Sequence, residues 1–318
     1  MEKQTETSPM KIRSSRACIA EGYRLYTNHF RTIVRRTWIT AVIYSIVTSI
    51  LGTFCVMTMP RLGILQMRVL SQPEAVMTED FMPLIWFVLL DFAFIAVAIW
   101  MVSCGFCLLR EHHQTSQITI QKKWYIPCWD SSIAWRTLKA VVCMTLIGSL
   151  VALIVWATQW GLFHVLSPIA SIVATSLVAI FFVFLMLPFI YTTTKYLMTK
   201  GRTFWELAVR DYATAFRHWG IVFVVVLVTV LIVLLVQGFI SMPALILTEA
   251  NVQANMGVIM GDPLGMPSYM TILTAAVFFL AGFVQAYVHL SILFPAYYMY
   301  GTIEIQEQER KNEKNPIH

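Results

Sequence analysis

Four polar side chains lie inside the most apolar stretches of this sequence, where their chemistry stands out. Asp91, in the segment FVLLDFAFIAV, is a carboxylic acid, and Gln237, Gln285 and His289 occupy two further apolar runs. Ionisable groups in a membrane interior are costly and usually line a watery path or pair with each other. Gln285 and His289 are four residues apart, so they share one face of a helix. The set therefore predicts either a proton-linked path or, with Asp91 protonated, hydrogen bonds that fix helix packing.

Methionine is concentrated in two connections between apolar runs. Ten of the 17 methionines lie in or beside residues 57–82 and 241–270. Thioethers are soft ligands that favour Cu(I), so the pairs Met57/Met59 and Met256/Met260 are candidate copper ligands. Methionine also fills irregular gaps in packed and partner-binding surfaces, and this second interpretation predicts no metal site.

Cysteine and histidine gather at the cytoplasmic end of the second apolar run and in the connection after it, as Cys104, Cys107, His112, His113 and Cys128. These are zinc-ligating residue types, but their spacing matches no standard zinc knuckle. Because the cytoplasm is reducing, we expect these cysteines to be small buried side chains and to form no disulfide. We found no Gly-rich phosphate loop and no nucleophile elbow, so the sequence predicts no catalytic residue and no cofactor.

The elements that position these side chains are six apolar runs. Hydrophobic residues make up 58% of the 318 residues, with a mean hydropathy of +0.69. Each run reaches the roughly 20 residues that a helix needs to cross a bilayer. The sequence predicts an all-α integral membrane fold with six transmembrane helices, near 37–57, 83–108, 140–160, 168–194, 219–241 and 270–299.

Charge predicts the orientation of these helices. Of the 23 Lys and Arg residues, 21 fall in the two termini and in the connections 109–139 and 195–218. The positive-inside rule makes this side cytoplasmic, so both termini are expected on the cytoplasmic side of the membrane. A net charge of +6 then matches an anionic lipid surface, and no nucleic-acid partner is predicted.

A basic aromatic phrase, R-x-Y-x-x-x-F-R, occurs at 24–31 and again at 210–217. Each copy precedes an apolar run and predicts an amphipathic helix at the cytoplasmic lipid surface. Tyr26 and Tyr212 are expected at the acyl boundary. Headgroup contacts are predicted for Arg24, Arg31, Arg35, Arg36, Arg210 and Arg217.

Two of the apolar runs also end alike, with LPFIY at 187–191 and FPAYY at 294–298. Pro188 and Pro295 are predicted to kink their helices, because proline removes a backbone donor. Together with the repeated phrase, these endings favour three hairpin repeats. With these features the chain resembles the six-span membrane domain fused to some bacterial glycerophosphodiester phosphodiesterases, and related stand-alone inner-membrane proteins. The resemblance implies the membrane fold but not the activity, because we find no phosphodiesterase domain in the sequence.

The sequence therefore predicts a disordered tail at 1–15, one membrane domain at 16–303 and a polar, solvated tail at 304–318. The leading functional prediction is a non-catalytic membrane protein that binds lipids or partner proteins, with a homo-oligomer as one arrangement. The alternative is a small transporter or permease for a hydrophobic solute, a proton or a soft metal ion. Membrane lipids are the predicted partner under the first of these.

Overall fold

The computed structural model describes residues 10–71, 81–115, 130–165, 167–199, 210–259 and 269–314, with the single positions 118, 201, 261 and 267. Within these residues every regular element is a helix. The elements are α1 (Ser15–Asn28), α2 (Phe30–Ser71), α3 (Met82–Thr115), α4 (Ser131–Phe163), α5 (Pro168–Met186), α6 (Pro188–Met198), α8 (Tyr212–Arg217), α9 (Trp219–Ile259), α10 (Tyr269–Ser291) and α11 (Leu293–Lys314).

Six helices in the described residues are long and apolar enough to cross a membrane. They coincide with the six predicted spans, so the all-α, multi-pass integral membrane fold is confirmed. Several of them continue past the predicted ends. In particular, α2 extends to Ser71 and α9 to Ile259, so much of both methionine-rich connections is helical.

Helix breaks lie beside the two prolines that end apolar runs. The helix that begins at Pro168 is interrupted at Leu187, and α6 starts with Pro188 as its first residue. The helix that begins at Tyr269 is interrupted at Ile292, three residues before Pro295. Proline clashes with the carbonyl four positions before it and cannot donate to it, which accounts for both interruptions.

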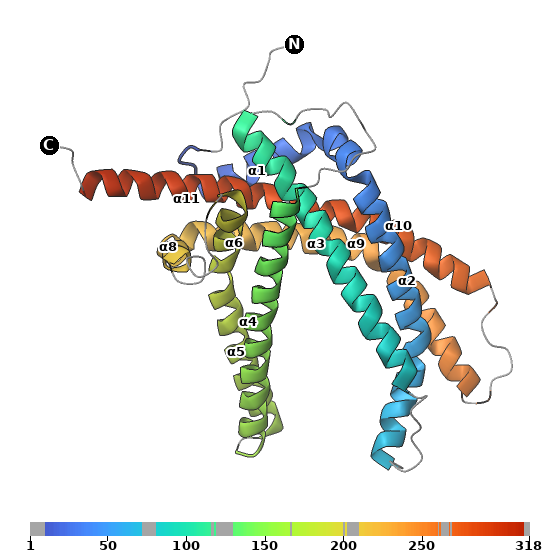
Figure 1. The fold of residues 1–318 in the computed structure, drawn as a ribbon. Helices are drawn as coiled ribbons and strands as arrows, with labels where there is room; N and C mark the ends of the chain where they lie inside the picture. Colours follow the sequence, from blue (N-terminus) through green and yellow to red (C-terminus); the bar gives the residue numbers. More distant parts are fainter. Residues whose placement is uncertain are drawn as a thin grey trace.

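The described helices divide into a bundle and a separate hairpin (Figure 1). Helices α3, α9 and α10 each contact α2, and α2 packs most closely along α10. Ser49 donates from its Oγ to the Ala275 carbonyl at 2.6 Å, and Ser45 donates likewise to Phe279. Such hydroxyl-to-backbone bonds join helices where apolar attraction between them is weak in lipid.

Helices α4 and α5 run side by side and diverge from α3, so their far ends stand apart from the bundle (Figure 1). In α4 the buried residues are Ile133, Thr137 and Ala140, all in its first third. In α5 they are Ser171 and Thr175. Most of this hairpin is therefore an exposed apolar surface, which is the surface that a membrane covers.

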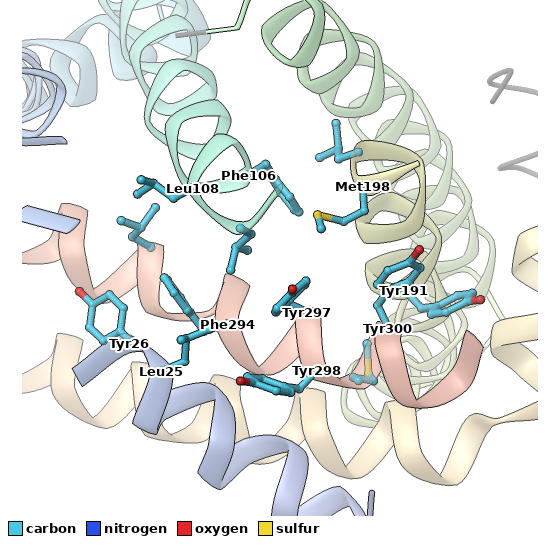
Figure 2. Close-up of a cluster of buried hydrophobic side chains, with 14 of the residues drawn as sticks. Leu25, Tyr26, Phe106, Leu108, Tyr191, Met198, Phe294, Tyr297, Tyr298 and Tyr300 are labelled. Atoms are coloured by element: carbon cyan, nitrogen blue, oxygen red, sulfur yellow. The ribbon is translucent and has the colours of Figure 1, made fainter. Parts of the chain in front are cut away.

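A buried cluster surrounds α11 and includes side chains of α1, α3 and α6 (Figure 2). We call this part of the molecule, with α1, α6, α8 and α11, the basic end. Phe294, Tyr297 and Tyr300 of α11 contribute large buried side chains. Residues 304–318 were expected to be a solvated tail, but α11 continues to Lys314. It continues because Glu304 and Glu307 form ion pairs with other helices, as described below.

The expected disordered tail at 1–15 lies largely outside the described residues. Residues 10–14 are described, and they contact α11. The Thr302 hydroxyl donates to the Lys11 carbonyl at 3.2 Å, and the Arg13 guanidinium lies 5.0 Å from the centre of the Tyr298 ring. Residues 10–14 therefore pack on α11.

Candidate functional site

Three of the four intramembrane polar residues come together between α9 and α10. His289 Nε2 lies 3.1 Å from Gln237 Oε1, and Gln285 Nε2 donates to Ser241 Oγ at 2.9 Å. The two pairs, His289 with Gln237 and Gln285 with Ser241, lie one helical turn apart along the interface of α9 and α10. Ser241 was not predicted, although its spacing of four from Gln237 places it on the same face of α9.

Asp91 does not join these links. It lies on α3, its side chain is exposed, and it forms no hydrogen bond or ion pair within the described part of the chain. The predicted path through Asp91, Gln285 and His289 is therefore not assembled in this structure.

The predicted headgroup arginines take different positions. Arg24, Arg31 and Arg35 are exposed, as a lipid contact requires. Arg36 is only 8% exposed and forms an ion pair of 2.5 Å with Glu111 of α3, so its predicted contact with lipid headgroups is wrong. A cation that enters a helix interface needs a counter-charge, and Glu111 supplies it.

Arg210 and Arg217, from the second basic phrase, lie beside α11. Arg210 is exposed, while Arg217 Nη1 lies 3.2 Å from Glu307 Oε1. Within this phrase α8 forms residues 212–217, and residues 202–209 before it lie outside the described residues.

The two tyrosines of the basic phrases face protein rather than the acyl boundary. Tyr26 is 8% exposed and donates to the Tyr287 carbonyl at 3.0 Å. Burial raises the pKa of its hydroxyl, so it stays protonated. Tyr212, half-buried, donates to the Leu185 carbonyl at 3.0 Å and packs on Phe189. The prediction for Tyr26 is wrong because its face of α1 packs against α10 and α11.

The methionine pairs do not form a copper site in the described residues. Met57 and Met59 both belong to α2, where residues two apart point in different directions. Met57 is half-buried and Met59 is 56% exposed, in agreement with that divergence. Met256 is an exposed residue of α9, and Met260 lies outside the described residues.

The cysteine and histidine group likewise forms no metal centre among its described members, which exclude Cys128. Cys107 is disulfide-bonded, contrary to the expectation of no disulfide, and a disulfide sulfur is not a zinc-binding thiolate. His112 is buried, with Nδ1 3.1 Å from the Tyr297 hydroxyl. Over the described residues, no group of three His, Cys, Asp or Glu side chains could hold a metal ion. Cys128 lies outside those residues.

Two features that the sequence did not predict are better candidate sites. The first is a cavity of about 800 Å³ where α4 diverges from α3, which we call the apolar groove. No charged residue lines it. The lining residues come from α3, α4, α6, the turn at Ile292 and α11, and they include Val102, Phe106, Met144, Gly148, Ile190, Leu197, Leu293 and Ala296.

Hydroxyl groups are the only polar side chains of the apolar groove. Thr137, Thr145, Ser149 and Thr194 each donate to a carbonyl of their own helix. The fifth, Thr193 Oγ1, is buried and has no hydrogen-bond partner in the described structure. Buried hydroxyls are normally paired, so Thr193 is available to a ligand. The close spacing of Thr145, Gly148 and Ser149 on α4 was the available sequence signal for this site.

The second feature is a charged junction between α6, the start of α8 and α11. Lys195 Nζ lies 2.5 Å from Glu304 Oε1 and 3.2 Å from Asp211 Oδ1, and the Tyr191 hydroxyl donates to Glu304 at 2.6 Å. Lys195 and Asp211 are both buried. Sequence reasoning placed Lys195 and Glu304 in solvated segments, because nothing local shows that residues 109 positions apart meet.

Comparison with known proteins leaves the site to be interpreted from its geometry. No family model, no curated protein and no solved structure matches the chain. The resemblance to the membrane domain of the phosphodiesterases therefore stays a prediction.

Proposed function

We propose that this protein is a non-catalytic, lipid-binding protein of the bacterial cytoplasmic membrane, and that the apolar groove holds the acyl chain of a phospholipid. The basic end faces the cytoplasm in this proposal. The observation that carries it is the groove itself, about 800 Å³ of uncharged space between α3, α4, α6 and α11.

The size and lining of the groove support an acyl ligand. Cavities that bind small molecules typically measure about 300 to 1,000 Å³ and are mostly apolar, with a few polar groups. A ligand with charged groups along its length would leave those groups unpaired beside Val102, Met144 and Leu293. A hydrocarbon chain has no hydrogen bonds to lose on entering the groove and no polar group to leave unpaired.

One polar contact along the groove fits an ester. The unpartnered Thr193 hydroxyl is a hydrogen-bond donor, and the carbonyl of an acyl ester is an acceptor. A pure hydrocarbon would leave this buried hydroxyl unsatisfied. The groove therefore favours an acyl ester over a simple alkane.

A cationic group stands next to the lining at the start of α4. Arg136 precedes the lining residue Thr137, and its guanidinium lies 4.3 Å from the centre of the Tyr196 ring. Its Nη2 is buried and has no hydrogen-bond partner among the described residues. Guanidinium groups bind phosphate oxygens through charge-assisted hydrogen bonds. Arg136 is therefore the residue that we assign to the lipid phosphate.

Native mass spectrometry of the protein, extracted in a mild, lipid-preserving detergent, tests this proposal. Gly148 and Gly161 both lie in α4, and a Cβ at either one meets nothing within 4 Å, but only Gly148 lines the groove. Gly148→Leu should place a side chain in the groove and reduce retained phospholipid, whereas Gly161→Leu should retain as much as the wild type. Equal retention by both variants would count against the groove as the lipid site.

A transporter is the second candidate, and the polar links between α9 and α10 are the observation that favours it. His289, Gln237, Gln285 and Ser241 could offer exchangeable hydrogen bonds to a solute. Proton or solute uptake into proteoliposomes that is lost in His289→Leu and kept in Gly148→Leu would favour transport over lipid binding.

A further inference from the structure

A second cavity lies on another face of α6, away from the apolar groove. Its volume is about 510 Å³, and residues of α6, α8 and α11 line it together with Arg210 and Asp211. We call it the charged pocket. Five basic side chains line it, against three acidic ones, which leaves an excess of two positive charges. The basic residues are Lys195, Arg210, Arg217, Arg310 and Lys311.

The three carboxylates of the pocket are already neutralised by close cations. Asp211 and Glu304 both pair with Lys195, at 3.2 and 2.5 Å. Glu307 pairs with Arg217 at 3.2 Å and with Arg310 at 3.0 Å. The imidazole of His218 is a third neighbour of Glu307, with Nε2 3.1 Å from Oε1. The carboxylates therefore contribute little net negative potential to the open part of the pocket.

The excess positive charge has no partner in the described structure. Arg210 and Lys311 form no ion pair with any described residue. In addition, Arg310 Nε is buried and without a hydrogen-bond partner among those residues, although the same side chain reaches Glu307. Cations that converge on one cavity repel each other unless an anion joins them.

We propose that the charged pocket binds a phosphate-bearing dianion, held by Arg210, Lys311 and Arg310. The excess of two positive charges matches a doubly charged group, and the forked guanidinium matches phosphate oxygens. The shared chemistry covers a phosphorylated lipid headgroup and a soluble phosphate compound. The pocket shares no lining residue with the apolar groove, so this proposal does not rest on lipid binding in the groove.

The first arm of the test uses a free anion. Sodium pyrophosphate is titrated calorimetrically into the protein in phosphatidylcholine nanodiscs, which offer no anionic headgroup. The variant is Arg210→Gln/Lys311→Gln, and the matched control is Lys11→Gln/Arg16→Gln, which removes two exposed charges near the start of α1 instead. Because both double variants lower the net charge equally, nonspecific attraction changes equally in both.

The second arm uses a lipid anion. The same three proteins are placed in nanodiscs that contain phosphatidic acid, whose phosphomonoester can be doubly charged, and native mass spectrometry counts the phosphatidic acid molecules that each retains. The lost charge-assisted hydrogen bonds should weaken binding about tenfold or more in Arg210→Gln/Lys311→Gln. The control should match the wild type.

A specific loss in the pyrophosphate arm would support a soluble phosphate compound as the ligand. A specific loss in the phosphatidic acid arm alone would support a lipid headgroup. Equal behaviour of the two double variants in both arms, or no binding by the wild type in either arm, would overturn the proposal. Gly148→Leu should bind pyrophosphate as the wild type does, so failure of the groove and failure of the pocket are separate results.

Discussion

Gly22 of α1 lies directly against the backbone of Pro295 in α11, so that a Cβ atom at Gly22 would stand 2.6 Å from the Pro295 nitrogen. The break at Ile292 starts α11 in a new direction, and this close approach lets α1 pack along it. The contact joins the first helix of the chain to its last.

Substituting Gly22 by alanine should therefore destabilise the fold. The neighbouring atoms belong to the backbone and cannot rotate away, and overpacking of this kind costs about 1 to 3 kcal/mol. Thermal unfolding in detergent checks this, with Gly220→Ala as the control because a Cβ there meets nothing within 4 Å. A Gly22→Ala protein as stable as Gly220→Ala would show that α1 does not approach α11 so closely.

Replacing Lys195 by methionine should destabilise the junction of α6 and α11. The change leaves the Asp211 and Glu304 carboxylates without their shared cation, and an uncompensated buried charge costs roughly 3 to 5 kcal/mol. The double variant Lys195→Met/Glu304→Gln should recover part of that loss, because one of the two carboxylates is removed. No recovery in a chemical-unfolding series would contradict the ion-pair geometry.

Two adjacent arginines should respond differently to the same substitution. Arg36→Gln removes the cation that pairs with Glu111 at a helix interface, and we expect a loss of about 2 kcal/mol or more. Arg35→Gln alters an exposed side chain and should change stability by less than about 0.5 kcal/mol. Melting temperatures of the two variants in the same detergent are the measurement, and equal shifts would place both arginines at the surface.

Asp91→Leu should leave folding intact or improve it. The side chain is exposed on a membrane-spanning helix and pairs with nothing in the described structure. Removing a carboxylate from a lipid-facing site favours insertion by up to about 3 kcal/mol. Expression level and melting temperature report the effect. A marked loss of stability would show that Asp91 binds a partner helix.

The sequence was sufficient to predict some of this architecture. Apolar runs of about 20 residues identify membrane spans by length alone, so all six were located. The shared face of Gln285 and His289 follows from helical periodicity, and both residues do contact polar groups of α9. The helix breaks lie beside Pro188 and Pro295, where proline chemistry places them.

The remaining features depend on contacts between distant segments. Arg35 and Arg36 are identical in type, but Arg36 is buried and pairs with Glu111, which lies 75 residues away in the sequence. The continuation of α11 depends on Lys195 and Arg217 in the same way. The apolar groove exists because α4 diverges from α3, and no local pattern specifies an angle between helices (Figure 1).

Photo-crosslinking tests the central proposal, a phospholipid acyl chain in the apolar groove, most directly. A phospholipid with a diazirine in mid-chain is added in trace amount to nanodiscs with excess unlabelled lipid, and the labelled residues are mapped by peptide mass spectrometry. We expect labels concentrated on Met144, Ile190 and Leu293, and their loss in Gly148→Leu but not in Gly161→Leu. Labels spread evenly over exposed residues such as Leu234 and Leu245, and unchanged in Gly148→Leu, would contradict the proposal.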